Sequence, residues 1–268
     1  MFWNAHEGSV PIGDTTMRYV AFGRGDQRLV ILPGLSDGLA TVRGKALLLV
    51  PPYRRFLDRF TVYVFSRRDQ LPMGYTIRQM AHDQATALEA LGIRDTHVMG
   101  VSQGGMIAQY LAIDRPDLVE KLVLAVTAPN VNETVRARVE SWIAMATVGD
   151  HKALMVDTAE HSYSPARLAK YRAAYPLLGL VGKPRSYERF LANAAAILDF
   201  DATSELQRIC APTLVLAGAN DRIVGTEAAA QLHQAIAGSR LHVYPGLGHA
   251  AYEEAPDFND RVFSFLEE

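Results

Sequence analysis

Short apolar runs and longer amphipathic stretches alternate along most of the chain. The apolar runs are four to six residues long and are bounded by Gly, Pro, Arg or Asp. This pattern is typical of buried β-strands. We therefore expect strands over residues 17–22, 29–32, 61–65, 97–101, 121–126, 213–217 and 241–244.

Amphipathic stretches follow several of these strands. Between residues 77 and 91 apolar side chains recur at steps of three and four, and Gly92 stands where a left-handed residue would end a helix. A second helical pattern, 103–113, lies between the strands 97–101 and 121–126. This strand–helix–strand order predicts a parallel sheet with right-handed crossovers. Two more helices are expected over residues 226–237 and 256–266.

The alternation stops between residues 129 and 200, where the sequence contains helical patterns and no convincing strand. We expect helices near residues 132–147, 151–161, 165–175 and 186–198. Asn132 with Glu133 suits the start of the first helix, and Pro165 suits a first turn, where its missing N–H costs nothing. We therefore divide the chain into an α/β core, residues 1–128 and 201–268, and an inserted helical cap or lid, residues 129–200.

Composition narrows the classes of protein that fit. The 268 residues carry 27 Lys and Arg against 29 Asp and Glu, with no long run of one sign, which argues against a nucleic-acid or anionic-membrane partner. No apolar stretch approaches the ~20 residues of a membrane span, and no signal-peptide pattern opens the chain. The single cysteine, Cys210, excludes an intrachain disulfide and is expected to be a small buried hydrophobe. A cytoplasmic protein fits best.

The first candidate for chemistry lies at the junction of the strand 97–101 and the helix 103–113. Residues 100–104 read Gly-Val-Ser-Gln-Gly, the Gly-x-Ser-x-Gly pattern of a nucleophile elbow. In an elbow a sharp turn lifts the serine hydroxyl above the sheet, and the flanking glycines let neighbouring backbone approach. The alternative is an ordinary strand-to-helix turn in which Ser102 caps the helix.

A serine hydroxyl becomes a nucleophile only when a histidine accepts its proton and an acid orients that histidine. His249 is the best base, because glycines at 246 and 248 frame it in the loop after the last expected strand. Asp221 is the acid we choose, because it follows the strand 213–217 at the sheet edge where open α/β sheets bind ligands. The alternative for Asp221 is an Asx turn beside Arg222.

Acyl transfer also needs amides that donate to the developing oxyanion. The N–H of Gln103, directly after the serine, is the first candidate. The second is the N–H of Leu35, because Gly34 before it permits a tight turn after the strand 29–32. The alternative for this loop is a plain surface turn.

Together these residues resemble the α/β-hydrolase superfamily. The matching positions are the elbow at 100–104, Asp221, His249 and the loop 33–35, and the chain order Ser, Asp, His is the one expected for that fold. The resemblance covers nearly the whole chain. It implies an α/β-hydrolase fold, with a mostly parallel central sheet flanked by helices and the helical cap inserted at 129–200.

Two positions depart from the usual pattern of that superfamily. Pro33 stands where many members have histidine, and we expect it to alter loop rigidity and spare the oxyanion hole. Residues 66–70 read Ser-Arg-Arg-Asp-Gln, where relatives often carry Asp-x-Arg-Gly-x-Gly. The sequence gives no role for Arg67, Arg68 or Gln70.

Metal and cofactor chemistry have little support in the sequence. One cysteine excludes a cysteine cluster, and no His-Glu-x-x-His motif occurs. Gly23 and Gly25 are not followed by the third glycine of a dinucleotide loop, because Arg28 stands there. We expect no metal and no cofactor.

Our interpretation is a serine hydrolase that cleaves a small or medium carboxylic ester through an acyl-enzyme. Ser102 is the nucleophile, His249 the base and then the acid, and Asp221 the orienting group. Lactone opening, amide cleavage, C–C bond cleavage and perhydrolysis use the same parts, and the superfamily resemblance does not choose among them. An alternative of another class is a ligand-binding sensor with little or no turnover.

The expected partner is a small ester or related acyl compound, and a homodimer is left open. Within the cap, Trp142, Met145 and Phe190 are candidates for the wall of the substrate pocket. The alternative is that they only pack the cap helices, as aromatic and Met side chains at helical spacing often do.

Overall fold

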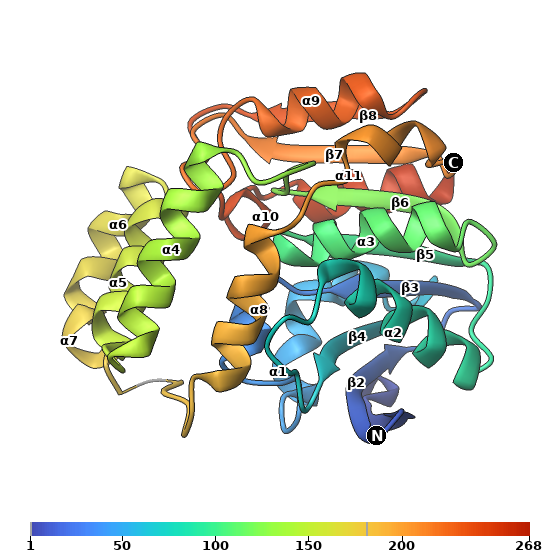
Figure 1. Cartoon of the computed structure of the whole chain (residues 1–268). Helices are drawn as coiled ribbons and strands as arrows, with labels where there is room; N and C mark the ends of the chain where they lie inside the picture. The colour runs from blue at the N-terminus through green and yellow to red at the C-terminus, as the bar shows by residue number, and fades with distance from the viewer. Residues whose placement is uncertain (1, 181) are drawn as a thin grey trace.

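The computed structural model describes residues 2–180 and 182–268, which form an α/β protein around one eight-stranded sheet (Figure 1). The strand order is β1-β2-β4-β3-β5-β6-β7-β8; β1 and β2 pair antiparallel, as do β2 and β4, and the remaining pairs are parallel. The predicted class, with a mostly parallel sheet, is confirmed. The strands are β1 (His6–Ile12), β2 (Thr15–Gly23), β3 (Gln27–Leu32), β4 (Phe60–Arg68), β5 (Thr96–Val101), β6 (Val119–Ala125), β7 (Thr213–Gly218) and β8 (Arg240–Tyr244).

All seven expected strands are present, and the sequence pattern missed only β1 among the described strands. β1 is an edge strand in which Val10 and Ile12 are the buried residues. Pro11 lies between them, and a proline within a run argues against an interior strand but is tolerated at an edge. Gly8 and Ser9 weaken the strand pattern further.

Helices cover both faces of the sheet (Figure 1). On one face lie α2 (Ile77–Ala90), α3 (Gln103–Asp114) and α9 (Ala228–Ala235); on the other lie α1 (Ala46–Leu49), α10 (Ala251–Glu254) and α11 (Phe258–Glu267). Because side chains alternate along a strand, neighbours on β5 enter different cores: Val98 packs on the α3 side and Met99 on the α11 side. Burial on both faces explains why the parallel strands are continuous apolar runs in the sequence.

Between residues 129 and 200, the described residues, 129–180 and 182–200, form a helical layer beyond the carboxyl ends of β6 and β7 (Figure 1). We call this segment the insert. Asn132 caps its first helix, as predicted, because its Oδ1 accepts a hydrogen bond of 2.9 Å from the Val135 amide. The helices of the insert are α4 (Glu133–Thr147), α5 (His151–Ser162), α6 (Pro165–Tyr171), α7 (Tyr175–Leu178) and α8 (Glu188–Leu198).

Three local expectations were wrong. The single helix expected over 165–175 is split: a 3₁₀ turn, Arg172–Ala174, separates α6 from α7. One cause is Pro176, which has no amide N–H to donate to an α-helical hydrogen bond. α9 is shorter than expected, because Ile236 leaves the helix in extended geometry and buries its side chain. Cys210 is exposed and not buried, because it lies in the loop before β7, two residues ahead of Pro212.

None of the helices in the described part of the chain combines the length and the apolar character that crossing a membrane requires.

Candidate active site

Ser102 occupies a strained turn between β5 and α3. Its backbone angles are φ 54° and ψ −120°, a combination that costs a non-glycine residue about 1–3 kcal/mol. Two hydrogen bonds hold the turn: the Ser102 amide donates to the Ala125 carbonyl at 2.9 Å, and the Thr127 hydroxyl donates to the Ser102 carbonyl at 2.7 Å. The expected elbow conformation is therefore present.

The glycines on either side of the elbow are required by close backbone contacts. A Cβ atom at Gly100 would lie 2.4 Å from the Gly104 carbonyl oxygen, and one at Gly104 would lie 1.9 Å from the Leu32 carbonyl oxygen. These atoms belong to backbone and cannot rotate away. The Gly-x-Ser-x-Gly spacing thus lets α3 begin directly against the end of β3.

The structure brings Ser102, His249 and Asp221 together, although 147 residues separate the serine from the histidine. The distance from His249 Nε2 to Ser102 Oγ is 3.0 Å, and that from His249 Nδ1 to Asp221 Oδ2 is 2.9 Å. With a proton on Nδ1, the imidazole donates to the carboxylate and accepts from the hydroxyl. Asp221 and His249 are buried, at 3% and 7% exposure.

The loop after β7 fixes the Asp221 carboxylate. Its Oδ1 accepts hydrogen bonds from the Ile223 and Val224 amides at 2.9 and 3.0 Å, which leaves Oδ2 for His249. The two backbone amides therefore set the orientation of the carboxylate, with Oδ2 toward His249.

The loops that carry Asp221 and His249 run side by side. The Asn220 amide donates to the Leu247 carbonyl at 2.8 Å. A Cβ atom at Gly218 would lie 2.2 Å from the Gly248 carbonyl oxygen, and one at Gly248 would lie 2.8 Å from the Ser162 carbonyl oxygen of the insert. The glycine before His249 thus lets the histidine loop pass between β7 and α5.

The loop after β3 lies beside the nucleophile. A Cβ atom at Gly34 would lie 3.3 Å from Ser102 Cβ and 3.8 Å from Ser102 Oγ. In the described parts of the chain, the amides of Leu35 and Gln103 donate no hydrogen bond to another group. Both candidate oxyanion donors therefore directly follow residues at the nucleophile, Gly34 and Ser102, and neither amide is used in the fold of the described residues.

A buried charge cluster, which the sequence did not predict, lies against this loop. It consists of Asp37, Arg67 at the end of β4 and Arg189 on α8. Asp37 Oδ2 accepts from the Arg67 amide at 3.0 Å and from Arg189 Nη2 at 2.7 Å, and Arg67 Nη1 lies 3.7 Å from it. Burial alone would raise the pKa of Asp37, but the Arg189 and Arg67 charges with hydrogen bonds from Ser66 and Arg189 hold it below its ordinary value.

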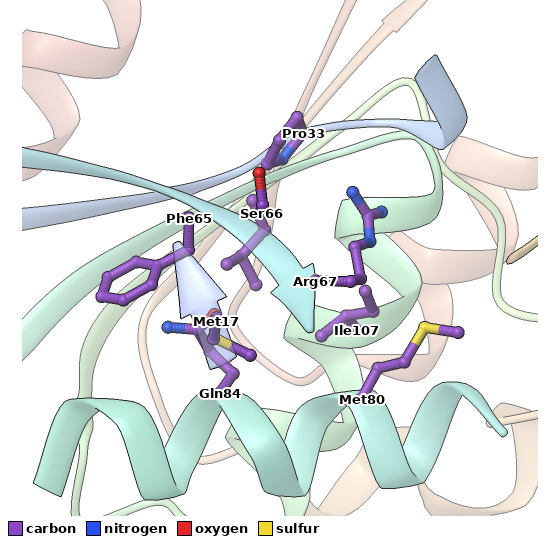
Figure 2. Close-up of a pocket in the computed structure, with 9 residues that line it drawn as sticks. Met17, Pro33, Phe65, Ser66, Arg67, Met80, Gln84 and Ile107 are labelled. Carbon is purple, nitrogen blue, oxygen red and sulfur yellow. The ribbon is translucent and has the colours of Figure 1, made fainter. Parts of the chain in front are cut away.

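The Arg67 guanidinium reaches from this cluster to both candidate oxyanion segments. Its Nη1 donates to the Gly34 carbonyl at 3.1 Å and its Nη2 donates to Gln103 Oε1 at 2.9 Å. Gln103 Nε2 in turn donates to the Asn193 carbonyl of α8 at 2.7 Å. Arg67 also lines a cavity of about 10 Å³, with Pro33 on one side and Met80 of α2 on the other (Figure 2).

Arg68 and Gln70 are not part of this cluster. Arg68 donates to the Tyr75 hydroxyl at 3.0 Å and to Asp14 at 2.9 Å, and Gln70 is exposed. The one sequence signal near the cluster is the Arg-Arg pair at 67–68, because consecutive side chains of a strand point to opposite faces and therefore have different partners.

The three candidate pocket residues of the insert are placed differently. Phe190 is buried against the loop after β3, where a Cβ atom at Gly38 would lie 2.9 Å from Phe190 Cα. Trp142 is buried and donates from its indole N–H to Asp157 on α5 at 2.8 Å, so part of its surface joins α4 to α5. Met145 is partly buried against the same apolar core.

Metal ligands are not gathered anywhere in residues 2–180 and 182–268: no group of three or more His, Cys, Asp or Glu side chains there could hold an ion.

Comparison with known proteins agrees with this geometry. Residues 27–256 match the family model described as alpha/beta hydrolase fold. The chain belongs to the α/β-hydrolase family. It is a hydrolase, and the fold and superfamily expected from the sequence are confirmed.

Three relatives illustrate the similarity, at 23–31% sequence identity. A RutD protein of Pseudomonas savastanoi pv. phaseolicola, named as a carbamate hydrolase, is 31% identical over 204 residues, which cover 73% of this chain and 77% of the relative. 3-Oxoadipate enol-lactonase 2 of Acinetobacter baylyi is 26% identical over 257 residues, 93% of this chain and 92% of the relative. The solved enol-lactonase of Burkholderia xenovorans LB400 superimposes with a TM-score of 0.82 at 23% identity, covering 97% of this chain and 100% of that one.

Proposed function

We propose that this hydrolase cleaves a small or medium carboxylic ester by nucleophilic catalysis with Ser102, His249 and Asp221. The observation that carries the proposal is the continuous hydrogen-bond chain of 3.0 and 2.9 Å from Ser102 Oγ through His249 to Asp221. That chain has the geometry of an activated serine, because each group lies within reach of the proton it must accept or hold.

The reaction then runs in two halves. Ser102 Oγ bonds to the ester carbonyl carbon while its proton passes to His249 Nε2, and the carbonyl oxygen becomes an oxyanion that accepts from the Leu35 and Gln103 amides. The alcohol leaves with the proton from His249, which gives the acyl-enzyme. Water, deprotonated by His249, then releases the acid and restores Ser102. Asp221 stabilises the imidazolium in both halves.

Lactones and carbamates are the variants of this substrate class that the relatives favour. Their names assign enol-lactone opening to one relative and carbamate hydrolysis to another. Both reactions begin with attack on a carbonyl carbon and pass through an oxyanion, so the same groups serve them. A lactone keeps its leaving alcohol tethered to the acyl-enzyme, whereas a carbamate loses an alcohol or amine.

We further propose that the insert acts as a cap over Ser102 and supplies the apolar wall of the substrate pocket. The support is its position beyond the carboxyl ends of β6 and β7 (Figure 1). Ser162 of the insert accepts from the Ala250 amide in the histidine loop, and Phe190 packs against Gly38 in the loop after β3. A roof of this kind separates the bound substrate from bulk solvent, while the one water that the second half of the reaction consumes still enters the site.

The test is active-site labelling with a fluorophosphonate, run beside a panel of p-nitrophenyl esters of graded acyl length, lactones and aryl carbamates. We expect one equivalent of label on Ser102 and turnover of at least one class. Ser102→Ala should remove the label and lower turnover by several decades while the circular dichroism spectrum stays unchanged.

Unchanged turnover in Ser102→Ala would refute the proposal. A folded wild-type protein that binds panel compounds and never turns them over would instead favour the ligand sensor. The panel also ranks ester, lactone and carbamate by kcat/KM.

A further inference from the structure

The Arg67 guanidinium is buried and lies between the two segments that carry the candidate oxyanion donors, and the proposed mechanism assigns it no step. We propose that Arg67 is a positioning residue for the oxyanion hole, holding the Gly34–Leu35 peptide and Gln103 so that both amides face the substrate oxygen. This inference rests on the proposed serine hydrolase function.

The first contact fixes the direction of the Leu35 amide. Gly34 C=O and Leu35 N–H belong to one planar trans peptide, so they point in opposite directions. Arg67 Nη1 donates to the Gly34 oxygen at 3.1 Å and the Asp37 amide donates to it at 3.2 Å, so the Leu35 N–H is directed away from Arg67. A charged donor on the carbonyl also polarises the peptide, which makes the N–H at its other end a stronger donor.

The second contact fixes the residue that follows the nucleophile. Gln103 is completely buried, and its side-chain amide is held at both ends, by Arg67 Nη2 at 2.9 Å and by the Asn193 carbonyl at 2.7 Å. The backbone of Gln103 therefore has little freedom to turn its N–H away from Ser102. One guanidinium thus spans both donors, which a lysine ammonium does not do, because it lacks the rigid fork.

The net charge of the cluster also favours this role for Arg67. The cluster contains two guanidinium groups and one carboxylate, with Arg67 and Asp37 side chains 4% and 2% exposed. Burial lowers the pKa of Arg67 to about 10, so at neutral pH the group remains charged. Lys45 also interacts with Asp37 and Arg189, so positive charge exceeds negative charge behind the two amides, where it favours an oxyanion over a neutral carbonyl.

The test compares Arg67→Met and Arg67→Lys with the matched control Arg68→Met, on the best ester of the panel. Arg68 is the next residue on β4, and its guanidinium binds Tyr75 and Asp14, away from the elbow. Each variant is measured for kcat, KM, melting temperature and the inhibition constant of a trifluoromethyl ketone that carries the acyl chain of the substrate. Ser102 adds to this ketone to give a hemiketal oxyanion, so its affinity reports the oxyanion hole.

We expect Arg67→Met to lower kcat about 10²-fold with KM within about twofold, because a misplaced donor acts on the transition state and not on the bound ester. Affinity for the ketone should fall by the same factor as kcat/KM. Arg67→Lys should lose less kcat and less ketone affinity than Arg67→Met, because lysine keeps the charge and one donor. Arg68→Met should lose stability and keep kcat and ketone affinity.

Three outcomes would overturn the inference: a folded Arg67→Met variant with kcat within twofold of wild type, losses in Arg67→Met that match those of Arg68→Met, or a kcat loss with ketone affinity unchanged. If Arg67→Met does not fold, the same criteria apply to Arg67→Lys. Failure of the proposed function is recognised separately, because it appears as a wild-type protein that fluorophosphonate does not label.

Discussion

The two oxygens of the Asp221 carboxylate have different partners, and this difference makes Asp221→Asn a sharp test of its role. Oδ1 accepts from two backbone amides, whereas Oδ2 faces His249 Nδ1. In the asparagine variant the amide oxygen must occupy the Oδ1 position, because an NH₂ group there would face two donors. The NH₂ group then donates to His249 Nδ1, so the imidazole carries its proton on Nε2. A protonated Nε2 cannot accept the proton of the Ser102 hydroxyl.

We therefore predict that Asp221→Asn lowers kcat about 10⁴-fold with the fold intact, as tautomer reversal does in a known triad. Steady-state kinetics and circular dichroism check this. Asp199→Asn is the control, because Asp199 is an exposed acid at the end of α8 and should leave kcat unchanged. Full activity in Asp221→Asn together with an essential Asp199 or Asp201 would place the acid elsewhere.

Asp37 makes a separate prediction about acid stability. Its pKa in the folded protein lies below the ordinary 3.8, since burial, which raises it, is outweighed by Arg189, Arg67 and hydrogen bonds. A lowered carboxyl pKa means that the folded state binds the proton less well than the unfolded state. The resulting stability is fully present above pH 3.8 and is lost as the pH falls through the folded pKa.

Asp37→Asn should flatten the dependence of the unfolding free energy on pH in that acid range. At pH 7 it should cost about 3–5 kcal/mol, because the buried Arg67 and the partly buried Arg189 lose their counter-ion. Urea unfolding at pH 7 and in a series from about pH 5 down to about pH 2 measures both effects. Asp14→Asn is the control, since that carboxylate is 85% exposed and its pair with Arg68 contributes little. An acid slope as steep in Asp37→Asn as in wild type would contradict the prediction.

At the scale of elements, the insert is fastened to two of the loops that carry candidate catalytic groups, the one after β3 and the one that carries His249. Arg189 of α8 donates to the carbonyl of Asp37, in the loop after β3, and to those of Arg67 and Arg68, the last two residues of β4. The junction of α5 and α6 is tied to the histidine loop, where the Ala250 amide donates to the Ser162 carbonyl at 2.9 Å. Opening the insert as a whole would therefore break a buried ion pair on one side and backbone hydrogen bonds on the other.

These attachments mark the limit of what the sequence could predict. Strands with both faces buried, the Gly-framed elbow at Ser102 and the Gly-framed His249 each leave a local pattern, because the steric requirement lies within a few neighbouring residues. Arg189 and Asp37 are 152 residues apart, and neither has a local pattern that identifies the other. The cluster depends on how α8 docks on the loop after β3, which is a tertiary contact that periodicity does not contain.

The predicted helix boundaries were wrong for a related reason. Helix propensity favours one helix over residues 165–175. Its interruption depends on Pro176, which has no amide N–H to donate, and on the groups that the 3₁₀ turn contacts. Arg172 and Tyr175 both bind Glu160 of α5, and that shared partner holds the 3₁₀ turn between α6 and α7 in place. A pattern read along one segment does not include a carboxylate on another.

For the whole molecule, chemistry and selectivity should separate by segment. The candidate catalytic groups Ser102, His249, Asp221 and the two amides all belong to segments outside residues 129–200, whereas the proposed pocket wall belongs to the insert. Apolar residues of both parts nevertheless join one core, which includes Leu35, Trp142 and Phe190. A change in the insert can therefore alter the pocket while the triad keeps its own hydrogen bonds.

We predict that Phe190→Ala, Trp142→Ala or Met145→Ala changes, in at least one case, the ratio of kcat/KM for short and long p-nitrophenyl esters by about tenfold or more, because each methylene in an apolar pocket contributes about 1–3 kcal/mol. Phe190 is the leading candidate, since it packs against the loop that carries Leu35. Trp142→Phe is the control for Trp142→Ala. It keeps an aromatic ring but loses the bond to Asp157, so it separates pocket volume from the link between α4 and α5.

Labelling of Ser102 by a small phosphonate should survive every variant of this series, because that reaction uses the nucleophile and little of the pocket wall. If all three alanine variants kept the chain-length profile of the wild type, the wall would have to come from core loops such as 35–39 and 67–74. If labelling disappeared from a folded variant, the insert would instead support the triad itself, and the separation of chemistry from selectivity would be wrong.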